Sequence, residues 1–259
     1  PASVAFVGFD RHEDNYSHLV LKDIILRKTG LVESVSPDIV VATEDFDSLR
    51  KVIRDYPPST LRILFNCELG SLNFNNFDYV IGWEDLPDTQ RYARMHPALR
   101  IRNSRFLTAE DAFPTKDDFL NREFCSFIVS NGVAHHFRDQ FFKKLSSRKR
   151  VDSWGRHLNN SGTLLNKVSP EGFEFEKMEV ESRYKFSMAI ENGVYPGHIT
   201  EKVFSAAKTG CIPIFWGNPL VGLDLNLKRI FSLHEFDNVD AAIEAILELE
   251  RDSAKLEAM

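Results

Sequence analysis

The sequence predicts an α/β protein built around two parallel sheets, and two observations support this class. Short apolar runs typical of buried strands alternate along the chain with segments that carry apolar residues at helical spacing. This alternation also occurs in two series, one in each half of the chain, with a polar stretch between them. We therefore expect two α/β units rather than one continuous sheet.

In the first half, the apolar runs predict strands at 3–9, 38–42, 62–65 and 79–81. Helices are expected at 17–27 and 43–53, and the second of these carries acidic residues in its first turn, where negative charge suits the helix dipole. In the second half we expect strands at 124–130, 184–190 and 211–215, and helices at 137–145, 200–208 and 239–256.

The polar segment 108–121, which contains Pro114, separates the two series. We therefore expect a first domain at 1–115 and a second at 116–259. The 259 residues are enough for one large or two small domains, each with its own core. Two such domains are a common way to hold a nucleotide and a second substrate.

Composition narrows the possible partners and the cellular location. The net charge of −6 argues against a nucleic-acid binder, which usually carries a basic surplus. The short basic run Arg148-Lys149-Arg150 is interpreted as a solvated turn or helix end, with contact to an anionic surface or a phosphate as the alternative. Cys67, Cys125 and Cys211 lie far apart beside apolar residues, which is typical of buried thiols in a reducing compartment.

Two short patterns could suggest a metal, and both favour another interpretation. Asp45-Phe46-Asp47 matches a D-x-D pattern that holds metal and nucleotide in many glycosyltransferases, but it falls where a helix is expected to begin. The adjacent pair His135-His136 suits neither a helical nor a strand metal face. We expect no metal ligands in this chain. No apolar run approaches the ~20 residues that cross a bilayer.

The segment 184–204 carries the chemistry. A buried strand ends at Glu191-Asn192, a loop rich in Gly and Pro follows, and a helix begins at Thr200. Ligands of open α/β sheets bind beyond the carboxyl ends of the strands, and a helix N-terminus there favours phosphate. Lys202 would add a full positive charge. The alternative is an ordinary capped helix with solvated charges.

The same segment matches a family signature. It reads Tyr184-Lys185-Phe186, then Ala189 to Asn192, His198 to Lys202, and Ile212 to Gly217. This stretch resembles the signature of the α-1,3/4-fucosyltransferase family, glycosyltransferase family 10, and further matches point to its bacterial branch. Those matches lie at Asn73 to Tyr79, Ile81 to Trp83, Asp88 to Arg94, Phe127 to Asn131, Arg138, Val151 to Arg156 and Asn159 to Gly162.

The resemblance implies a GT-B fold, with two Rossmann-like domains facing across a cleft. It implies an inverting transfer of fucose from GDP-fucose to a glycan acceptor of the N-acetyllactosamine type, with α-1,3 linkage and without an essential metal. The first domain would bind the acceptor and the second the donor. A bacterial-type enzyme would be cytoplasmic, with peripheral association at the inner face of the membrane as a variant. The oligomeric state is not predicted.

The resemblance also implies residue roles. Lys202, Asn192 and Arg156 would stabilise the leaving GDP, and Glu201 would hold the ribose. His198 stands where many relatives have Tyr and would contact the nucleotide. Glu68 would be the base that accepts the proton of the acceptor hydroxyl, at the carboxyl end of the strand expected at 62–65. Tyr184 and Lys185 are assigned to donor binding or to framing the strand.

Two departures keep other functions open. Cys67 and Leu69, which flank Glu68, differ from the family pattern. The alternatives are a transferase that uses another nucleotide sugar, and a catalytically silent protein that binds glycans or sugar nucleotides.

Overall fold

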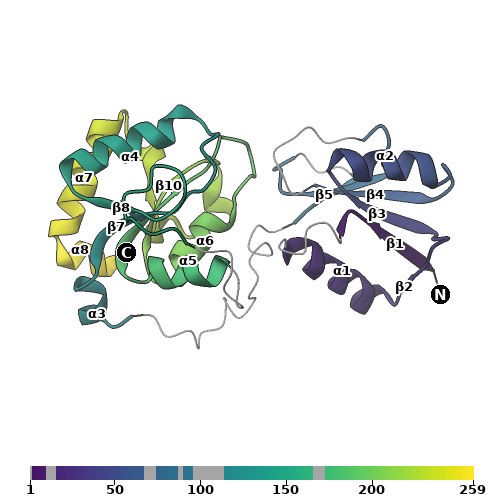
Figure 1. Cartoon of the computed structure of the whole chain (residues 1–259), viewed down its shortest axis with the longest axis horizontal. Helices are drawn as coiled ribbons and strands as arrows, with labels where there is room; N and C mark the ends of the chain where they lie inside the picture. Colours follow the sequence, from purple (N-terminus) through teal and green to yellow (C-terminus); the bar gives the residue numbers. More distant parts are fainter. Residues whose placement is uncertain (1, 10–15, 67–73, 87–89, 96–113, 166–172) are drawn as a thin grey trace. The chain divides into compact units, whose positions relative to one another are not determined.

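The computed structural model describes residues 2–9, 16–66, 74–86, 90–95, 114–165 and 173–259. The chain divides into two compact units, Pro1–Arg102 and Asn103–Met259. Both are α/β units with parallel sheets, so the predicted fold class is confirmed (Figure 1). The sequence placed the boundary between the domains near residue 115.

The first unit contains a six-stranded parallel sheet in the order β2-β1-β3-β4-β5-β6. Its elements are β1 (Ser3–Val7), α1 (Tyr16–Thr29), β2 (Val32–Glu33), β3 (Ile39–Thr43), α2 (Phe46–Asp55), β4 (Leu61–Phe65), β5 (Tyr79–Gly82) and β6 (Tyr92–Arg94). Alternate side chains of β3 and β4 enter different cores: Val41 and Phe65 belong to one cluster, Val40 and Leu64 to the other. A sheet buried on both faces explains why these strands read as continuous apolar runs.

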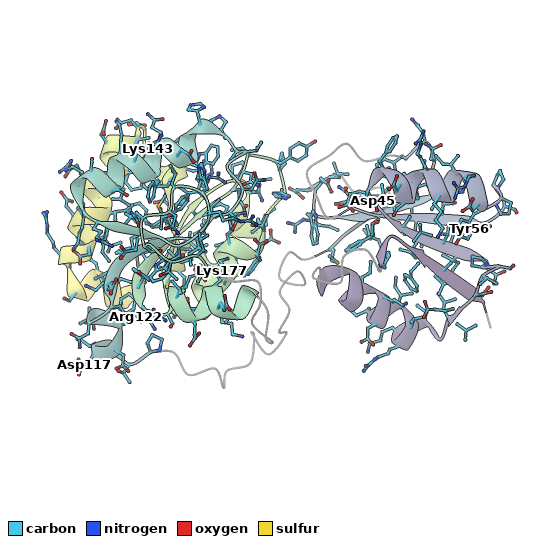
Figure 2. The ribbon with its side chains drawn as sticks, viewed as in Figure 1. Asp45, Tyr56, Asp117, Arg122, Lys143 and Lys177 are labelled. Carbon is cyan, nitrogen blue, oxygen red and sulfur yellow. The ribbon has the colours of Figure 1, made fainter. Side chains whose placement is uncertain are left out.

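The D-x-D pattern of the first unit has a structural role at Asp45. Asp45, labelled in Figure 2, is the N-cap of α2. Its carboxylate accepts hydrogen bonds from the Ser48 backbone N–H at 3.0 Å and from the Thr43 hydroxyl at 2.5 Å. The helix therefore begins at Phe46, three residues later than predicted, because capping requires Asp45 to stay extended.

The second unit contains a five-stranded parallel sheet in the order β11-β10-β9-β7-β8. Its strands are β7 (Glu123–Phe127), β8 (Val151–Ser153), β9 (Tyr184–Ile190), β10 (Ile212–Trp216) and β11 (Phe231–Ser232). Its α-helices are α3 (Lys116–Leu120), α4 (His136–Arg148), α5 (Phe173–Glu181), α6 (Glu201–Lys208), α7 (Val239–Arg251) and α8 (Ser253–Ala258). Figure 1 shows α4 and α7 on one side of this sheet and α5 and α6 on the other.

Several predicted boundaries are wrong for local physical reasons. The single helix expected at 239–256 is divided into α7 and α8, because Asp252 leaves helical geometry and its carboxylate caps the Lys255 N–H. β7 ends at Phe127 rather than at 130. The strands β2, β6, β8 and β11 were missed because two or three residues are too few to show a periodic pattern.

The strand order of the second unit contains a switch point between two neighbouring strands, β7 and β9. From β7 the chain crosses outward to β8, and it then returns to form β9 on the other side of β7. β7 and β9 are thus neighbours whose crossovers run in opposite directions. Crevices for ligands form at such switch points, beyond the carboxyl ends of the two strands.

Candidate functional site

A buried carboxylate lies at the carboxyl end of β9. Glu191 has no exposed surface. One of its carboxylate oxygens, Oε1, accepts hydrogen bonds from the Thr200 backbone N–H and from the Thr200 hydroxyl, each at 2.8 Å. Its other oxygen lies 2.9 Å from the ammonium of Lys202, whose side chain is 15% exposed. A buried charge is tolerated only when it is paired and hydrogen-bonded, and Glu191 meets both conditions.

The same contacts hold the start of α6. Thr200 is the N-cap of this helix and accepts from the Lys202 N–H at 3.4 Å, so the predicted cap is confirmed. A lysine in a first turn opposes the helix dipole. The sequence predicted that Lys202 adds its charge to a phosphate site, and the structure gives this ammonium a partner within the chain, Glu191. The Lys202 side chain nevertheless keeps 15% of its surface exposed near the helix N-terminus, where an anion is favoured.

Asn192 is fixed by a second buried charge. The Arg138 guanidinium, with no exposed surface, donates from Nη1 to the Asn192 side-chain oxygen at 2.7 Å and from Nη2 to the Asn131 carbonyl at 2.8 Å. Burial lowers the pKa of Arg138, and the nearby carboxylates of Asp139 and Glu191 oppose this shift. These contacts join the loops after β7 and β9 at the switch point.

Arg156 follows the neighbouring strand, β8, and is exposed. The preceding Gly155 packs directly against the backbone of Val129, leaving no room for a side chain. The following residue, His157, donates its backbone N–H to the Val129 carbonyl at 3.0 Å. The loop that carries Arg156 is therefore attached to the loop after β7, on the same edge of the sheet.

The two remaining residues predicted to contact the nucleotide, His198 and Glu201, lie within two residues of Thr200 in the chain. His198 is buried in the loop before α6, and its backbone N–H donates to the Tyr195 carbonyl. Glu201 is the first residue of α6 and is half-buried. The structure thus brings Asn192, His198, Glu201 and Lys202 to one edge of the sheet, with Arg156 on the loop beside it.

Tyr184 and Lys185 do not lie at this edge. They begin β9, and six residues of strand separate Tyr184 from its carboxyl end, about 20 Å at the usual rise. The Tyr184 hydroxyl accepts from the Trp154 indole at 2.9 Å and contacts Asp152, while Lys185 pairs with Glu250 at 3.2 Å. These contacts favour the framing role over donor binding. Arg122, labelled in Figure 2, marks the same end by donating to the Thr209 carbonyl.

Glu68, the predicted base, lies outside the described residues, as do its neighbours Cys67 and Leu69. No group of three or more His, Cys, Asp or Glu side chains suited to a metal occurs in the described parts of the chain. Within those same parts, no helix is long and apolar enough to cross a membrane.

Sequence reasoning assigned no role to Glu191 or Arg138, which organise the site. One signal was available. Glu191 directly follows a run of buried strand residues, and an acid in that place needs a buried partner. For Arg138 the family match was the available signal, but the sequence could not predict its main partner, which is 54 residues away.

Comparison with known proteins decides the family. A model described as the C-terminal part of glycosyltransferase family 10 (fucosyltransferase) matches residues 120–258, more than half of the chain. The chain belongs to glycosyltransferase family 10. The cluster at the carboxyl end of β9 and the loop of Arg156 fall inside the matched region.

The curated relatives that match this chain are longer than the chain itself. It is 32% identical over 216 residues to the α-(1,3)-fucosyltransferase FucT of Helicobacter pylori, covering 71% of this chain and 43% of the relative. It is 34% identical over 188 residues to α-(1,3)-fucosyltransferase B of Drosophila melanogaster, covering 67% and 39%. The chain therefore spans less than half the length of these relatives.

A solved structure supports the fold over the whole chain. The crystal structure of an α1,3-fucosyltransferase with GDP-fucose aligns with a TM-score of 0.76 and 24% identity, over 99% of this chain and 80% of that one. The GT-B type expected from the family resemblance agrees with this fold.

Proposed function

We propose that this protein is an inverting fucosyltransferase that moves L-fucose from GDP-fucose to a hydroxyl of a glycan. The observation that carries the proposal is the cluster at the switch point of the second sheet. There Lys202, the N-terminus of α6 and Asn192 lie at one edge, inside the region that matches family 10.

The chemistry of this cluster suits departure of a nucleoside diphosphate. Breaking the bond between fucose and phosphate leaves the electron pair on the diphosphate of GDP. Groups held in place beforehand stabilise this developing charge without the cost of reorganisation. The Lys202 ammonium and the N-terminus of α6 supply positive charge, the amide of Asn192 supplies hydrogen-bond donors, and the exposed Arg156 adds a second cation. Glu201 would hold the ribose and His198 the nucleotide.

Inversion requires a base on the acceptor side. As the acceptor hydroxyl attacks the anomeric carbon, Glu68 would take its proton, and GDP would leave from the opposite face. A positioned base of this kind contributes about 10²- to 10⁴-fold to the rate. No metal is required in this scheme, because protein cations neutralise the diphosphate. Activity retained in EDTA would support that expectation, and loss restored by Mn²⁺ would overturn it.

The acceptor proposed is an N-acetyllactosamine-type glycan, with α-1,3 linkage. The names of the Helicobacter and Drosophila relatives support this linkage. A different acceptor is suggested by another relative, the GDP-fucose protein O-fucosyltransferase 3 of Bos taurus, which is 29% identical over 124 residues. A cytoplasmic location with peripheral membrane association remains part of the proposal, tested by cell fractionation.

Transfer is tested by incubating the protein with GDP-fucose and a panel of glycan and peptide acceptors. We expect GDP release that depends on an N-acetyllactosamine acceptor, and an α-1,3 linkage by NMR. Glu68→Gln should abolish transfer and leave GDP affinity nearly unchanged. The matched control is Glu33→Gln, an exposed acid on β2 of the same unit. Transfer by Glu68→Gln at the wild-type rate would contradict the assigned base.

The departures at Cys67 and Leu69 favour one further candidate, a protein that binds sugar nucleotides without turnover. Tight GDP binding with no transfer across the whole panel would support it. A transferase for another donor is distinguished by thermal shifts with GDP-fucose, GDP-mannose and UDP sugars, since the preferred donor stabilises the folded state most.

A further inference from the structure

Aromatic side chains gather at the carboxyl end of β10. The ring of Trp216, the last residue of that strand, lies within 23° of parallel to the rings of Phe137 and His234, whose centroids are 4.7 and 6.3 Å away. His135 adds a fourth ring, with its centroid 5.1 Å from that of Trp216. None of these four side chains is fully buried, so packing in the core does not account for the cluster.

A cavity of about 480 Å³ opens beside this aromatic cluster, between α4 and the segment that leads from β11 to α7. Its volume is in the range of small-molecule sites. Phe137, Trp216 and His234 line it. The polar residues of the lining are Gln140, Lys144, Asp237, Asn238 and Asp240. The cavity therefore combines aromatic rings with hydrogen-bonding groups.

Charge restricts what the cavity can hold. The ammonium of Lys144 lies 2.8 Å from both carboxylate oxygens of Asp240, so this cation is already neutralised within the chain. Asp237 adds a second carboxylate, and the three charges together are negative. A phosphate or carboxylate ligand is disfavoured there, because like charges repel. A wholly apolar ligand is disfavoured as well, because it would cover polar groups without hydrogen-bonding them.

A pyranose ring of a neutral sugar suits such a lining. The C–H groups on its faces pack against electron-rich aromatic rings, and its hydroxyls donate and accept hydrogen bonds. The oxygen of Asn238 caps α7 by accepting the Ala241 N–H at 2.9 Å. In the part of the chain that the structure describes, no residue is hydrogen-bonded to the Asn238 amide nitrogen or to the side chains of Gln140 and Asp237. These groups are left for the hydroxyls of a sugar.

The cavity lies one strand away from the cluster at the switch point. Trp216 pairs with Ile190, the last residue of β9, and neighbouring strands are about 4.8 Å apart. Asn192 and Lys202 do not line the cavity. A glycan a few sugars long therefore spans the distance between the cavity and the end of β9.

We propose that this cavity is a glycan subsite, which holds a neutral pyranose of the acceptor away from the hydroxyl that receives fucose. The inference rests on the proposed function, because a glycan acceptor is what brings such a sugar to this edge of the sheet. The subsite acts by binding alone, and no bond is made or broken in it. It gives the second unit a part in choosing the acceptor, and it favours acceptors longer than a disaccharide.

The test compares two acceptors for transfer from GDP-fucose, N-acetyllactosamine and a soluble oligomer of three such units. In the wild type the KM of the oligomer should be about tenfold lower, because the oligomer adds the contacts of one further sugar. The double variant Gln140→Ala/Asp237→Ala should lose most of this difference. It should keep the wild-type KM for N-acetyllactosamine and the wild-type dissociation constant for GDP.

Two further variants separate binding from folding. Lys143, labelled in Figure 2, is exposed on α4 and does not line the cavity, so Lys143→Ala should leave the difference between the acceptors intact. Trp216→Leu should abolish the difference, but it also removes the packing contact with Phe137. Gln140 and Asp237 are exposed, and their replacement keeps the test independent of folding.

Saturation-transfer NMR with the oligomer and GDP reports glycan binding without turnover, which separates the two claims. Binding that the double variant loses, together with no transfer to either acceptor, would overturn the proposed function and support the subsite. Neither binding nor transfer would overturn both. Transfer by the wild type with equal KM for the two acceptors, or a difference that survives in the double variant, would overturn the subsite alone. An equal loss in Lys143→Ala would also overturn it, because the effect would then not depend on the cavity.

Discussion

Replacing Glu191 by glutamine should destabilise the second unit strongly although it changes only one heavy atom. One carboxylate oxygen accepts the Thr200 N–H, and the other faces the Lys202 ammonium. Glutamine must point its NH₂ group at one of these donors, whichever way its amide is turned. One hydrogen bond is therefore lost and one buried donor faces another.

The size of the effect follows from these contacts. A hydrogen bond to a charged group contributes about 1.5 to 3 kcal/mol, and a buried unsatisfied donor costs about 1 to 3 kcal/mol more. Breaking a buried ion pair from one side costs about 3 to 5 kcal/mol, which agrees. Lys202 is 15% exposed and can turn partly toward water, so we expect a cost of about 3 kcal/mol. For a unit of this size that lowers the melting temperature by roughly 6 to 12 °C.

The assay is thermal unfolding followed by circular dichroism and calorimetry. The control is Glu244→Gln, which removes one partner of an ion pair with Arg148 in the same unit. Both side chains of that pair are about half exposed, so the control should melt close to the wild type. A melting temperature of Glu191→Gln within about 2 °C of the wild type would refute the reasoning, because it would mean that the buried carboxylate is not needed as an acceptor.

Three further predictions follow from burial, packing and charge. Burial raises the pKa of the Cys125 thiol well above its usual value and raises that of Cys211 to about 12. In a Cys67→Ser variant, neither thiol should therefore react with a thiol reagent at pH 8 until the protein is unfolded. Rapid labelling of the native protein would contradict this prediction. Gly155→Ala should lower the free energy of unfolding by about 1 to 3 kcal/mol and weaken GDP binding, because the new Cβ collides with the Val129 backbone. The control is Gly193→Ala, whose new Cβ meets nothing within 4 Å and which should unfold as the wild type does. Burial of Glu250 raises its pKa, but hydrogen bonds from Lys149 and Lys185 outweigh this and hold the pKa below 4.5. This carboxylate therefore stabilises the fold above its unfolded pKa, and that contribution disappears as the pH falls through the lower folded pKa. The difference in melting temperature between wild type and Glu250→Gln should accordingly shrink from pH 6 to pH 3, and a constant difference would exclude the mechanism.

Local patterns predicted those elements whose stability depends on neighbours in the sequence. The strand at 184–190 is observed with the predicted bounds, and Thr200 caps its helix as expected. Both depend on side chains within a few residues of one another, a run of apolar residues in one case and a hydroxyl near a free N–H in the other. The long apolar runs likewise identified the parallel sheets.

Roles that depend on distant partners could not be read in the same way. Tyr184 and Lys185 belong to the same motif as Asn192, yet the extended strand carries them about 20 Å from its carboxyl end. Their partners Asp152 and Glu250 are 32 and 65 residues away. Residues that belong to one sequence motif therefore need not lie together in space, because an extended strand separates Tyr184 and Lys185 from Asn192.

The sequence by itself determined the α/β class, the family and the segment that forms the switch-point cluster after β9, because periodicity, capping and the motif are properties of neighbouring residues. Only the tertiary structure decided which charges hold that cluster in place. Arg138 and Glu191 are separated by 53 positions along the chain, yet both reach the carboxyl end of β9, one from α4 and the other at the strand's own end. The parallel sheet brings these ends to one edge, and their burial there makes each charge dependent on the partners that the fold supplies.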